Sequence, residues 1–192
     1  MRGLFADPAV SGLNYVEDFV DPGEETALIG RIESLGLAPF RFQGWLGKRL
    51  TRSFGWRYDF DNASFVSTEP IPDWLAPLRD RAAEFAKIPA DDFAHALVVR
   101  YDPGAGIGWH RDRPVFDQVV GVSLGAPASM RFRQRTAGGF KRASVALDPR
   151  SAYLLSGEVR HDWEHSIAPG NALRFSITFR SLSDLGRTKA ES

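Results

Sequence analysis

The pattern of hydrophobic and polar positions changes about half-way along the chain. Before residue 93, two stretches carry hydrophobic residues three or four positions apart, which is the spacing of an amphipathic helix. From residue 93 onward, short hydrophobic runs are separated by Gly, Pro and Asp, as is typical of strands joined by turns. Helices followed by a series of strands predict an α+β fold whose core is a β-sandwich or jelly roll.

The two predicted helices carry no obvious chemical groups. Asp21 and Pro22 supply an N-cap and a first-turn proline for a helix that ends at Gly36. Asp73 is expected to cap a second helix that runs to about Lys87. Both helices are therefore expected to pack against the core.

The strands are predicted from short hydrophobic runs bounded by turn residues. A short strand or extended entry is expected at 12–20, and further strands at 96–101, 118–124, 129–134, 143–147, 152–155 and 172–180. We expect one domain over residues 1–192, with its core at about 93–182 and a disordered tail at 186–192.

Residues 40–66 differ from the rest of the chain because aromatic and basic side chains interleave there with glycines. This composition suits stacking on nucleobases together with neutralisation of phosphate. Alternatively, the segment is a β-hairpin whose aromatic side chains fill a core, since many exposed aromatics would be a liability. The glycines indicate turns or a mobile flap.

Composition narrows the chemistry. The chain has no cysteine, so disulfides, thiolate metal sites and cysteine nucleophiles are excluded, and any metal must be bound by His, Asp or Glu. No apolar run approaches about 18 residues, and the first residues lack the apolar core of a signal peptide. We therefore expect a cytoplasmic monomer with no membrane part.

The charge is balanced overall but unevenly distributed. Lys and Arg together number 24, as do Asp and Glu. Two stretches, 41–58 and 131–142, each contain five basic residues and no acid, so the remainder has 24 − 10 = 14 basic against 24 acidic residues. Such asymmetry can steer an anionic substrate to one face, although two solvated basic surfaces would look the same.

A candidate metal site lies in the segment YDPGAGIGWHRD, residues 101–112. On a strand, residues two apart point to the same face, so His110 and Asp112 could present an imidazole and a carboxylate to one ion. With a second histidine they would form the two-His, one-carboxylate set of non-haem Fe(II) oxygenases. That histidine could be His95, His161 or His165, and spacing alone does not separate the last two.

A pair of arginines follows in the segment RFSITFR, residues 174–180. The spacing of six places Arg174 and Arg180 on one face of a strand, with Phe175, Ile177 and Phe179 on the other. The planar guanidinium matches a carboxylate. If this face is buried, a bound dicarboxylate is a natural partner; if it is exposed, the arginines only face solvent.

Taken together, RYDPGAGIGWHRD, LSGEVRHDWEHSI and RFSITFR resemble the AlkB family of 2-oxoglutarate-dependent Fe(II) dioxygenases over about residues 96–180. The segment RSFGWRYDF lies where that family has its nucleotide-recognition lid. The resemblance implies a double-stranded β-helix (jelly-roll) core with N-terminal packing helices and a lid hairpin.

The resemblance also implies roles for individual residues, with no catalytic side chain beyond the metal centre. The implied Fe(II) ligands are His110, Asp112 and His165. The implied 2-oxoglutarate contacts are Tyr101, Arg174 and Arg180. The implied substrate contacts are Trp56, Arg57 and Tyr58.

The activity that the resemblance implies is oxidative demethylation of alkylated bases in single- or double-stranded nucleic acid. O2 is the cosubstrate, and formaldehyde, succinate and CO2 are released. The chain departs from the DNA-repair members at Val99, where they have asparagine, and at Arg113 and Pro114, where they have acidic residues. Two alternatives therefore stay open: the same chemistry on a protein side chain or small molecule, and a non-catalytic jelly-roll binding module.

Overall fold

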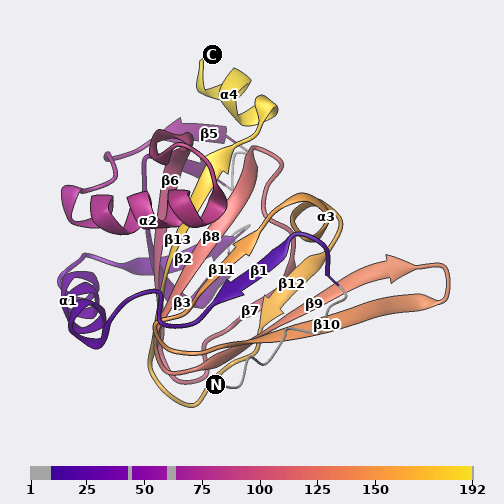
Figure 1. Ribbon diagram of the computed structural model, residues 1–192, viewed down its shortest axis with the longest axis horizontal. Coiled ribbons are helices and arrows are strands. Elements are labelled where there is room, and N and C mark those ends of the chain that lie inside the picture. Colours follow the sequence, from indigo (N-terminus) through magenta and orange to yellow (C-terminus); the bar gives the residue numbers. More distant parts are fainter. Residues whose placement is uncertain (1–9, 43–44, 60–63, 192) are drawn as a thin grey trace.

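The computed structural model describes residues 10–42, 45–59 and 64–191, shown as a ribbon in Figure 1. The elements, in chain order, are β1 (Leu13–Val16), α1 (Pro22–Glu33), β2 (Ala38–Phe42), β3 (Trp45–Phe54), β4 (Trp56–Asp59), β5 (Ser64–Ser67), η1 (Asp73–Leu75), α2 (Ala76–Ala86), η2 (Ala90–Asp92), β6 (Phe93–Tyr101), β7 (Ile107–His110), β8 (Phe116–Gly125), β9 (Ala128–Thr136), β10 (Gly139–Leu147), β11 (Ala152–Leu155), α3 (Gly157–His161), β12 (Glu164–Ile167), β13 (Arg174–Leu182) and α4 (Asp184–Ala190).

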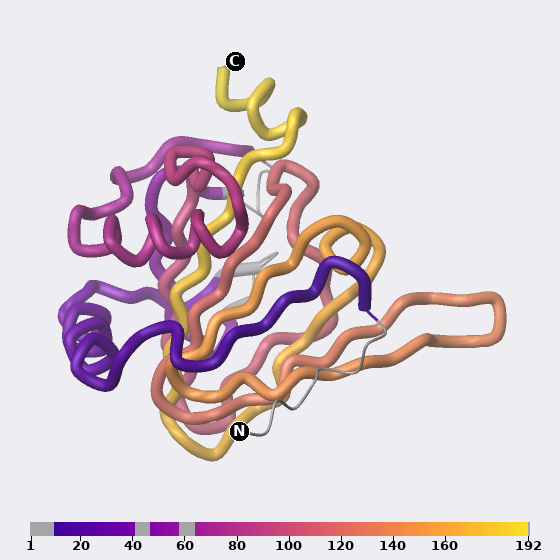
Figure 2. Tube along the Cα trace, viewed as in Figure 1, coloured from indigo at the N-terminus to yellow at the C-terminus, as the bar shows by residue number. Residues whose placement is uncertain are grey.

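Two main antiparallel sheets form the body of the molecule. The larger has the strand order β1-β11-β8-β13-β6-β3-β2, and the smaller has the order β10-β9-β12-β7. Strands distant in the sequence are neighbours: β1 pairs with β11, and the tube in Figure 2 shows this N-terminal strand beside a segment from the last third of the chain. The predicted α+β fold with a jelly-roll core is confirmed.

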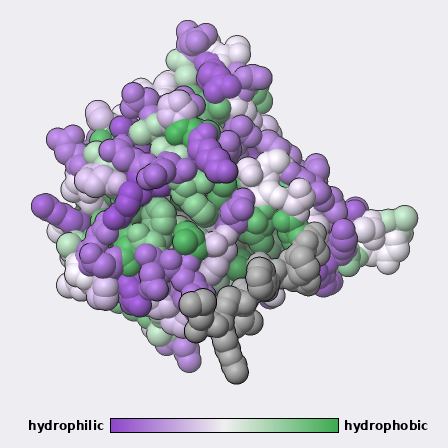
Figure 3. All heavy atoms as spheres, viewed as in Figure 1, coloured by the Kyte–Doolittle hydropathy of each residue, from purple (hydrophilic) through white to green (hydrophobic). Residues whose placement is uncertain are grey.

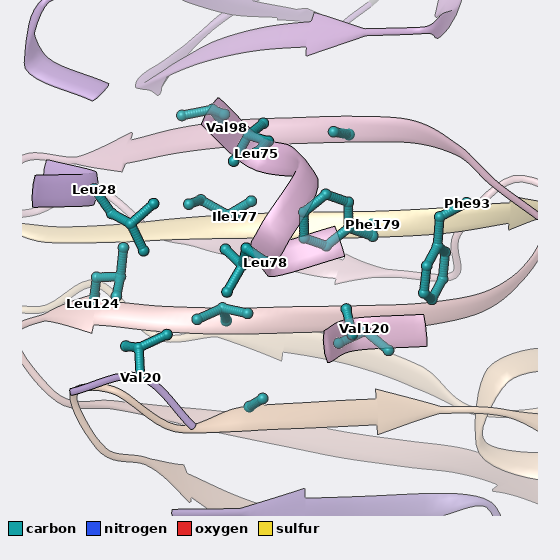
Figure 4. Packing of buried hydrophobic residues seen from close by; sticks show 14 of the residues in the cluster. Val20, Leu28, Leu75, Leu78, Phe93, Val98, Val120, Leu124, Ile177 and Phe179 are labelled. Atoms are coloured by element: carbon teal, nitrogen blue, oxygen red, sulfur yellow. The ribbon is translucent and has the colours of Figure 1, made fainter. Parts of the chain in front are cut away.

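The large sheet is buried on both faces. Its outer face packs against α1 and α2, where Leu28 and Leu78 contact the same cluster as Ile177 and Phe179 (Figure 4). Its inner face packs against the small sheet, where Tyr153 and other inward side chains meet those of β9, β10 and β12. Hydrophobic side chains remain visible between α1 and α2, framed by hydrophilic ones (Figure 3).

The alternation predicted for β13 is confirmed. Phe175, Ile177 and Phe179 belong to the cluster under the helices. Ser176, Thr178 and Arg180 point to the inner side, where they line a cavity. A single strand therefore supplies hydrophobic packing on one face and polar groups on the other.

The predicted helices are present, but only one is capped as expected. The Asp21 side chain accepts a hydrogen bond of 2.8 Å from the backbone N–H of Glu24, which caps α1. Asp73 does not cap α2: it is the first residue of the η1 turn, which precedes the helix and has no side-chain cap. Two prolines, at 72 and 77, favour this tighter start.

The segment at 184–190, within and just before the predicted tail, is helical rather than disordered. The Ser183 side chain accepts a hydrogen bond from the backbone N–H of Gly186 and donates one to the carbonyl of Pro114. Gly186 packs so closely that a Cβ there would lie 2.0 Å from the Val115 carbonyl oxygen. Docking against this loop therefore gives a polar segment a fixed structure.

Two strands were not predicted, β7 and β12, each four residues long. Both are too short and too polar to stand out as hydrophobic runs, yet together they form one edge of the small sheet. Their importance lies in the histidines that they carry.

Residues 40–66 form two antiparallel pairs in the part that the structure describes. β2 and β3 extend the large sheet, because β3 pairs with β6, whereas β4 and β5 form a separate two-stranded pair. Residues 43–44 and 60–63 lie outside the described residues. A lid function for this segment stays a prediction.

The helices in the described part of the chain are short. The longest, α1, has 12 residues, and none is long and apolar enough to cross a membrane.

Truncating Phe179 tests the packing between the large sheet and the helices. Its side chain is fully buried, so Phe179→Ala removes a ring and leaves a cavity; we expect a loss of about 3–5 kcal/mol in the free energy of unfolding. Leu185→Ala, at a side chain that is 48% exposed, should change it by less than about 0.5 kcal/mol. Urea titration of both variants measures the difference, and equal losses would contradict this packing.

Candidate metal centre and adjoining cavity

The structure brings His110, Asp112 and His165 together. His110 ends β7 and His165 lies directly opposite it on β12. Each of the three offers one ligand atom, and these atoms all lie within 4.8 Å of one another. Asp112 lies two residues beyond the end of β7, so only His110 of the pair is on the strand itself.

The other two histidines lie elsewhere. His161 is exposed on α3, where Nε2 is 3.1 Å from an Asp117 carboxylate oxygen. His95 is buried on β6 and packs against the ring of Phe116, with centroids 4.9 Å apart. The geometry therefore separates His165 from His161, which spacing could not do.

The hydrogen bonds made by His110 and Asp112 leave one atom of each side chain free to bind a metal. His110 Nδ1 is 2.8 Å from the Gly108 carbonyl oxygen; since a carbonyl only accepts, this nitrogen carries the proton and Nε2 keeps its lone pair. Asp112 Oδ1 accepts a bond of 3.1 Å from Arg180 Nη2. Asp112 Oδ2 is buried and has no partner in the described structure, as expected of an atom that binds a metal.

The electrostatics favour the protonation states that a metal needs. Burial is the main cause that lowers the pKa of His165 to about 3, and the neighbouring His110 acts in the same direction. Burial also lowers the pKa of His110. Burial would raise the pKa of Asp112, but Arg180 and the two histidines outweigh it and hold that pKa well below its usual range. At neutral pH the group thus offers two neutral imidazoles and a carboxylate, which suits Fe(II).

Arg174 is a buried cation whose hydrogen bonds are incomplete. Its side chain on β13 is 4% exposed, and Nη2 donates to Ser123 Oγ at 3.1 Å. The guanidinium carbon lies 4.8 Å from the centre of the Tyr101 ring. Nε and Nη1 are buried without a partner in the described structure. A buried cation of this kind needs an anion, and a carboxylate matches its planar fork.

A cavity of about 1010 Å³ adjoins the group of three. The predicted residues Tyr101, Arg180 and Arg57 line it. Trp56 does not: its ring stacks on Phe65 of β5, with centroids 4.9 Å apart. The Tyr58 side chain lies outside the described residues.

Sequence reasoning missed several residues of the cavity wall. Tyr153 lies inside it, and its ring sits so close to Gly121 that a Cβ there would be 2.2 Å from Tyr153 Cζ. Burial raises the pKa of Tyr153 to about 12, so the phenol stays protonated. Arg49, which in the sequence is only one cation of the basic stretch 41–58, was missed as well; His95, named above as a candidate ligand, lies in this wall and not in the group of three. None belongs to a recognisable motif, although the missing side chain at Gly121 within a hydrophobic strand is a weak signal of close packing.

Comparison with known proteins agrees with this geometry. The family model described as the 2OG-Fe(II) oxygenase superfamily matches residues 43–180. The tRNA (carboxymethyluridine(34)-5-O)-methyltransferase alkbh8 of Xenopus tropicalis is 29% identical over 164 residues, covering 82% of this chain and 25% of the relative. Alpha-ketoglutarate-dependent dioxygenase AlkB of Escherichia coli (strain K12) is 32% identical over 125 residues, 57% of this chain and 55% of the relative.

A solved structure shares the fold. The structure of OsALKBH1 superposes with a TM-score of 0.65 at 18% identity, over 88% of this chain and 96% of that one. Of the two relatives named above, the chain spans about a quarter of the length of the Xenopus tropicalis methyltransferase and about half of the length of the Escherichia coli AlkB.

The lowered histidine pKa values predict how the metal-free protein responds to acid. Between pH 6.5 and 3, the unfolded chain binds a proton at residue 165 that the folded chain does not, so the free energy of unfolding falls as the pH falls. His165 alone contributes a slope of up to about 1.4 kcal/mol per pH unit.

Urea titrations of the metal-free protein across this pH range measure the slope. His165→Gln should flatten it without abolishing it, because His95 and His110 carry shifts in the same direction. An unchanged slope in His165→Gln would contradict a buried, neutral imidazole at this position.

Proposed function

The chain belongs to the 2OG-Fe(II) oxygenase superfamily and is an AlkB-like dioxygenase that uses Fe(II), 2-oxoglutarate and O2; we propose that it acts on alkylated bases of nucleic acid. The observation that carries the nucleic-acid part is a basic, aromatic face that adjoins the cavity. The other residue roles given below belong to the same proposal.

The residues of the metal centre fit the cofactors. We assign His110, Asp112 and His165 as the Fe(II) ligands, because two neutral imidazoles and an ionised carboxylate meet there with Asp112 Oδ2 unsatisfied. Arg174, buried with free donors, would bind the far carboxylate of 2-oxoglutarate. Tyr101, which lies beneath that guanidinium and lines the cavity, would contact the same molecule.

When bound, Fe(II) and 2-oxoglutarate would supply the activation of O2. 2-Oxoglutarate would be converted to succinate and CO2, and an oxidised N-methyl group would leave as formaldehyde. The chain's own residues position and protect this chemistry. Arg180 holds the Asp112 carboxylate ionised and oriented. The buried wall around Met130, Tyr153 and Ile167 limits the access of water to the site.

The outer face of the small sheet is basic. Since Met130 and Phe132 point into the core, Arg131 and Arg133 on the same strand point outward. Both guanidinium groups lie over the Trp109 ring, 5.3 and 4.5 Å from its centre. Glu164 pairs with Arg133 at 2.6 Å.

The same face continues along the β9–β10 hairpin, which projects from the body of the molecule (Figure 1, right). The guanidinium groups of Arg133, Arg135 and Arg142 lie over the ring of Phe140. Stacked arginines of this kind are held in place for contacts with phosphate, and exposed rings can stack on bases.

The basic face reaches the cavity through β7 and the loop after it. Trp109, which contacts the arginines of β9, also lines the cavity, as does Arg111. A strand whose phosphates lie on this face could therefore place an unstacked base in the cavity beside the metal centre, where Arg57 also lines the wall. The names of the two relatives, which refer to a tRNA methyltransferase and to AlkB, support this substrate class.

Coupled turnover tests the proposal. The protein with Fe(II) and 2-oxoglutarate is offered matched panels of methylated DNA, methylated RNA and methylated peptides, and succinate and formaldehyde are measured. We expect oligonucleotides to stimulate turnover, with a steep fall as salt increases. Stimulation by peptides alone would favour the protein-side-chain alternative. Intact 2-oxoglutarate binding without stimulation by any oligonucleotide would refute the nucleic-acid part.

Arg174→Gln tests the cosubstrate site. Loss of a buried charged partner costs about 2–5 kcal/mol, so the affinity for 2-oxoglutarate should fall by about 30-fold or more. The matched control is Arg100→Gln: this arginine lies on the neighbouring strand and already has an anionic partner, Asp102, at 2.9 Å. Titration of the Fe(II)–2-oxoglutarate absorption band compares the two variants, and an equal affinity would contradict the assignment of Arg174.

A further inference from the structure

The wall of the cavity is strongly cationic. Among the described residues that line it, the charged ones other than histidine are the arginines at 49, 52, 57, 111, 113 and 180 and the acids Glu69 and Asp112. Both acids are already paired: Glu69 with Arg52 at 2.7 Å, and Asp112 with Arg180 at 3.1 Å. Neither acid is therefore available to a positively charged substrate.

The cofactors do not remove this excess. The two positive charges of Fe(II) and the two negative charges of 2-oxoglutarate cancel. Arg174 provides a positive charge for the cosubstrate in addition to those in the cavity wall. In the part of the chain that the structure describes, Arg49, Arg57 and Arg111 therefore remain in the wall as cations without an ion pair, available to the substrate.

Arg49 is held in the cavity wall by an aromatic ring and not by an acid. It lies on β3, and its guanidinium carbon is 3.9 Å from the centre of the Phe40 ring, which also lines the cavity. It forms no ion pair or hydrogen bond with any other side chain that the structure describes. The stack against Phe40 holds the cation in place but does not neutralise it.

Arg49 lines the same cavity as the three residues of the metal centre. Burial lowers the pKa of Arg49 itself; Tyr101 opposes this effect and Arg180 adds to it. A half-buried cation without an anionic partner is costly to maintain, which suggests that a ligand supplies the anion.

We infer that the substrate presents an anionic group, a phosphate or a carboxylate, to Arg49 beside the metal centre, and that bases with a fixed positive charge are disfavoured. The inference rests on the proposed function and narrows its substrate class. Methylated bases that are cationic, such as 1-methyladenine and 3-methylcytosine, would meet these arginines, and no described residue of the wall offers them an available acid. Neutral methylated bases, such as N6-methyladenine and 3-methyluracil, would not meet this repulsion.

Binding of small probes tests the role of Arg49 without turnover. The protein is loaded with Mn(II) and 2-oxoglutarate in the absence of O2, and calorimetry measures its affinity for 3-methyluridine, for 3-methyluridine 5′-monophosphate and for 5-carboxymethyluridine. At least one anionic probe should bind about tenfold or more tightly than the neutral nucleoside, as expected for one charge-assisted hydrogen bond. The anionic probe that binds more tightly than 3-methyluridine shows whether the anion is a phosphate or a carboxylate.

Variants of Arg49 separate this role from a structural one. Arg49→Gln should abolish the gain, so that neutral and anionic probes bind with equal affinity, whereas Arg49→Lys should retain part of it. The control is Arg31→Gln, at an exposed position in the last turn of α1, which should keep the full gain. Equal binding of neutral and anionic probes to the wild-type protein, or a gain that survives in Arg49→Gln, overturns the inference. A loss of 2-oxoglutarate affinity in Arg49→Gln overturns it too, because Arg49 would then serve the cosubstrate.

Competition between two oligonucleotides tests whether cationic methylated bases are disfavoured. One sequence carries either N6-methyladenine or 1-methyladenine at the same position, and we expect kcat/KM to be about tenfold or more higher for the neutral base. Comparable values overturn the inference while leaving the proposed function intact. If no oligonucleotide is oxidised but an anionic probe still binds through Arg49, the proposed function fails and the anion site stands.

Discussion

The buried ion pair between Arg180 and Asp112 connects the two parts of the structure on which the chemistry depends. Arg180 belongs to β13 in the large sheet, and Asp112 follows β7 in the small sheet. One contact therefore joins the sheets at the metal centre, keeps the carboxylate ionised and occupies one of its oxygens, while the second oxygen stays without a partner in the described structure. A buried pair of this kind adds little net stability, so its value lies in the orientation that it imposes.

Much of the fold and of the metal centre could be predicted from local patterns. The alternation along β13 separates phenylalanines from arginines, and a period of two is visible in the sequence of a single strand. The H-x-D pair indicated two residues that the structure brings together, although Asp112 lies two residues beyond the end of the strand. The third residue, His165, required a resemblance to a known family, since His161 has the same chemistry at nearly the same spacing.

The remaining features depend on which strands are neighbours, and a local pattern does not contain that information. Arg49 reads as one cation in a basic segment until β3 is paired with β6, which brings it near Tyr101. Tyr153 reads as a core residue until its ring is seen against Gly121 on β8. The helix α4 depends on docking to a loop some seventy residues earlier in the chain. The departure at Arg113, visible in the sequence, agrees with the cationic cavity that the structure reveals.

The pairing of His110 with His165 has a consequence for how this chain can go wrong. Side chains on a strand alternate between faces, so a slip of one residue between β12 and its neighbours would turn His165 outward and Ser166 inward. The same slip would turn Glu164 and Ser166 away from β9. Arg133 would then lose its ion pair with Glu164, and Arg131 would lose its hydrogen bond to Ser166. A misregistered chain would thus lose its group of possible metal ligands and the ordered basic face of the small sheet together. Activity in this protein therefore reports on the correct pairing of two four-residue strands, not only on the presence of the right side chains.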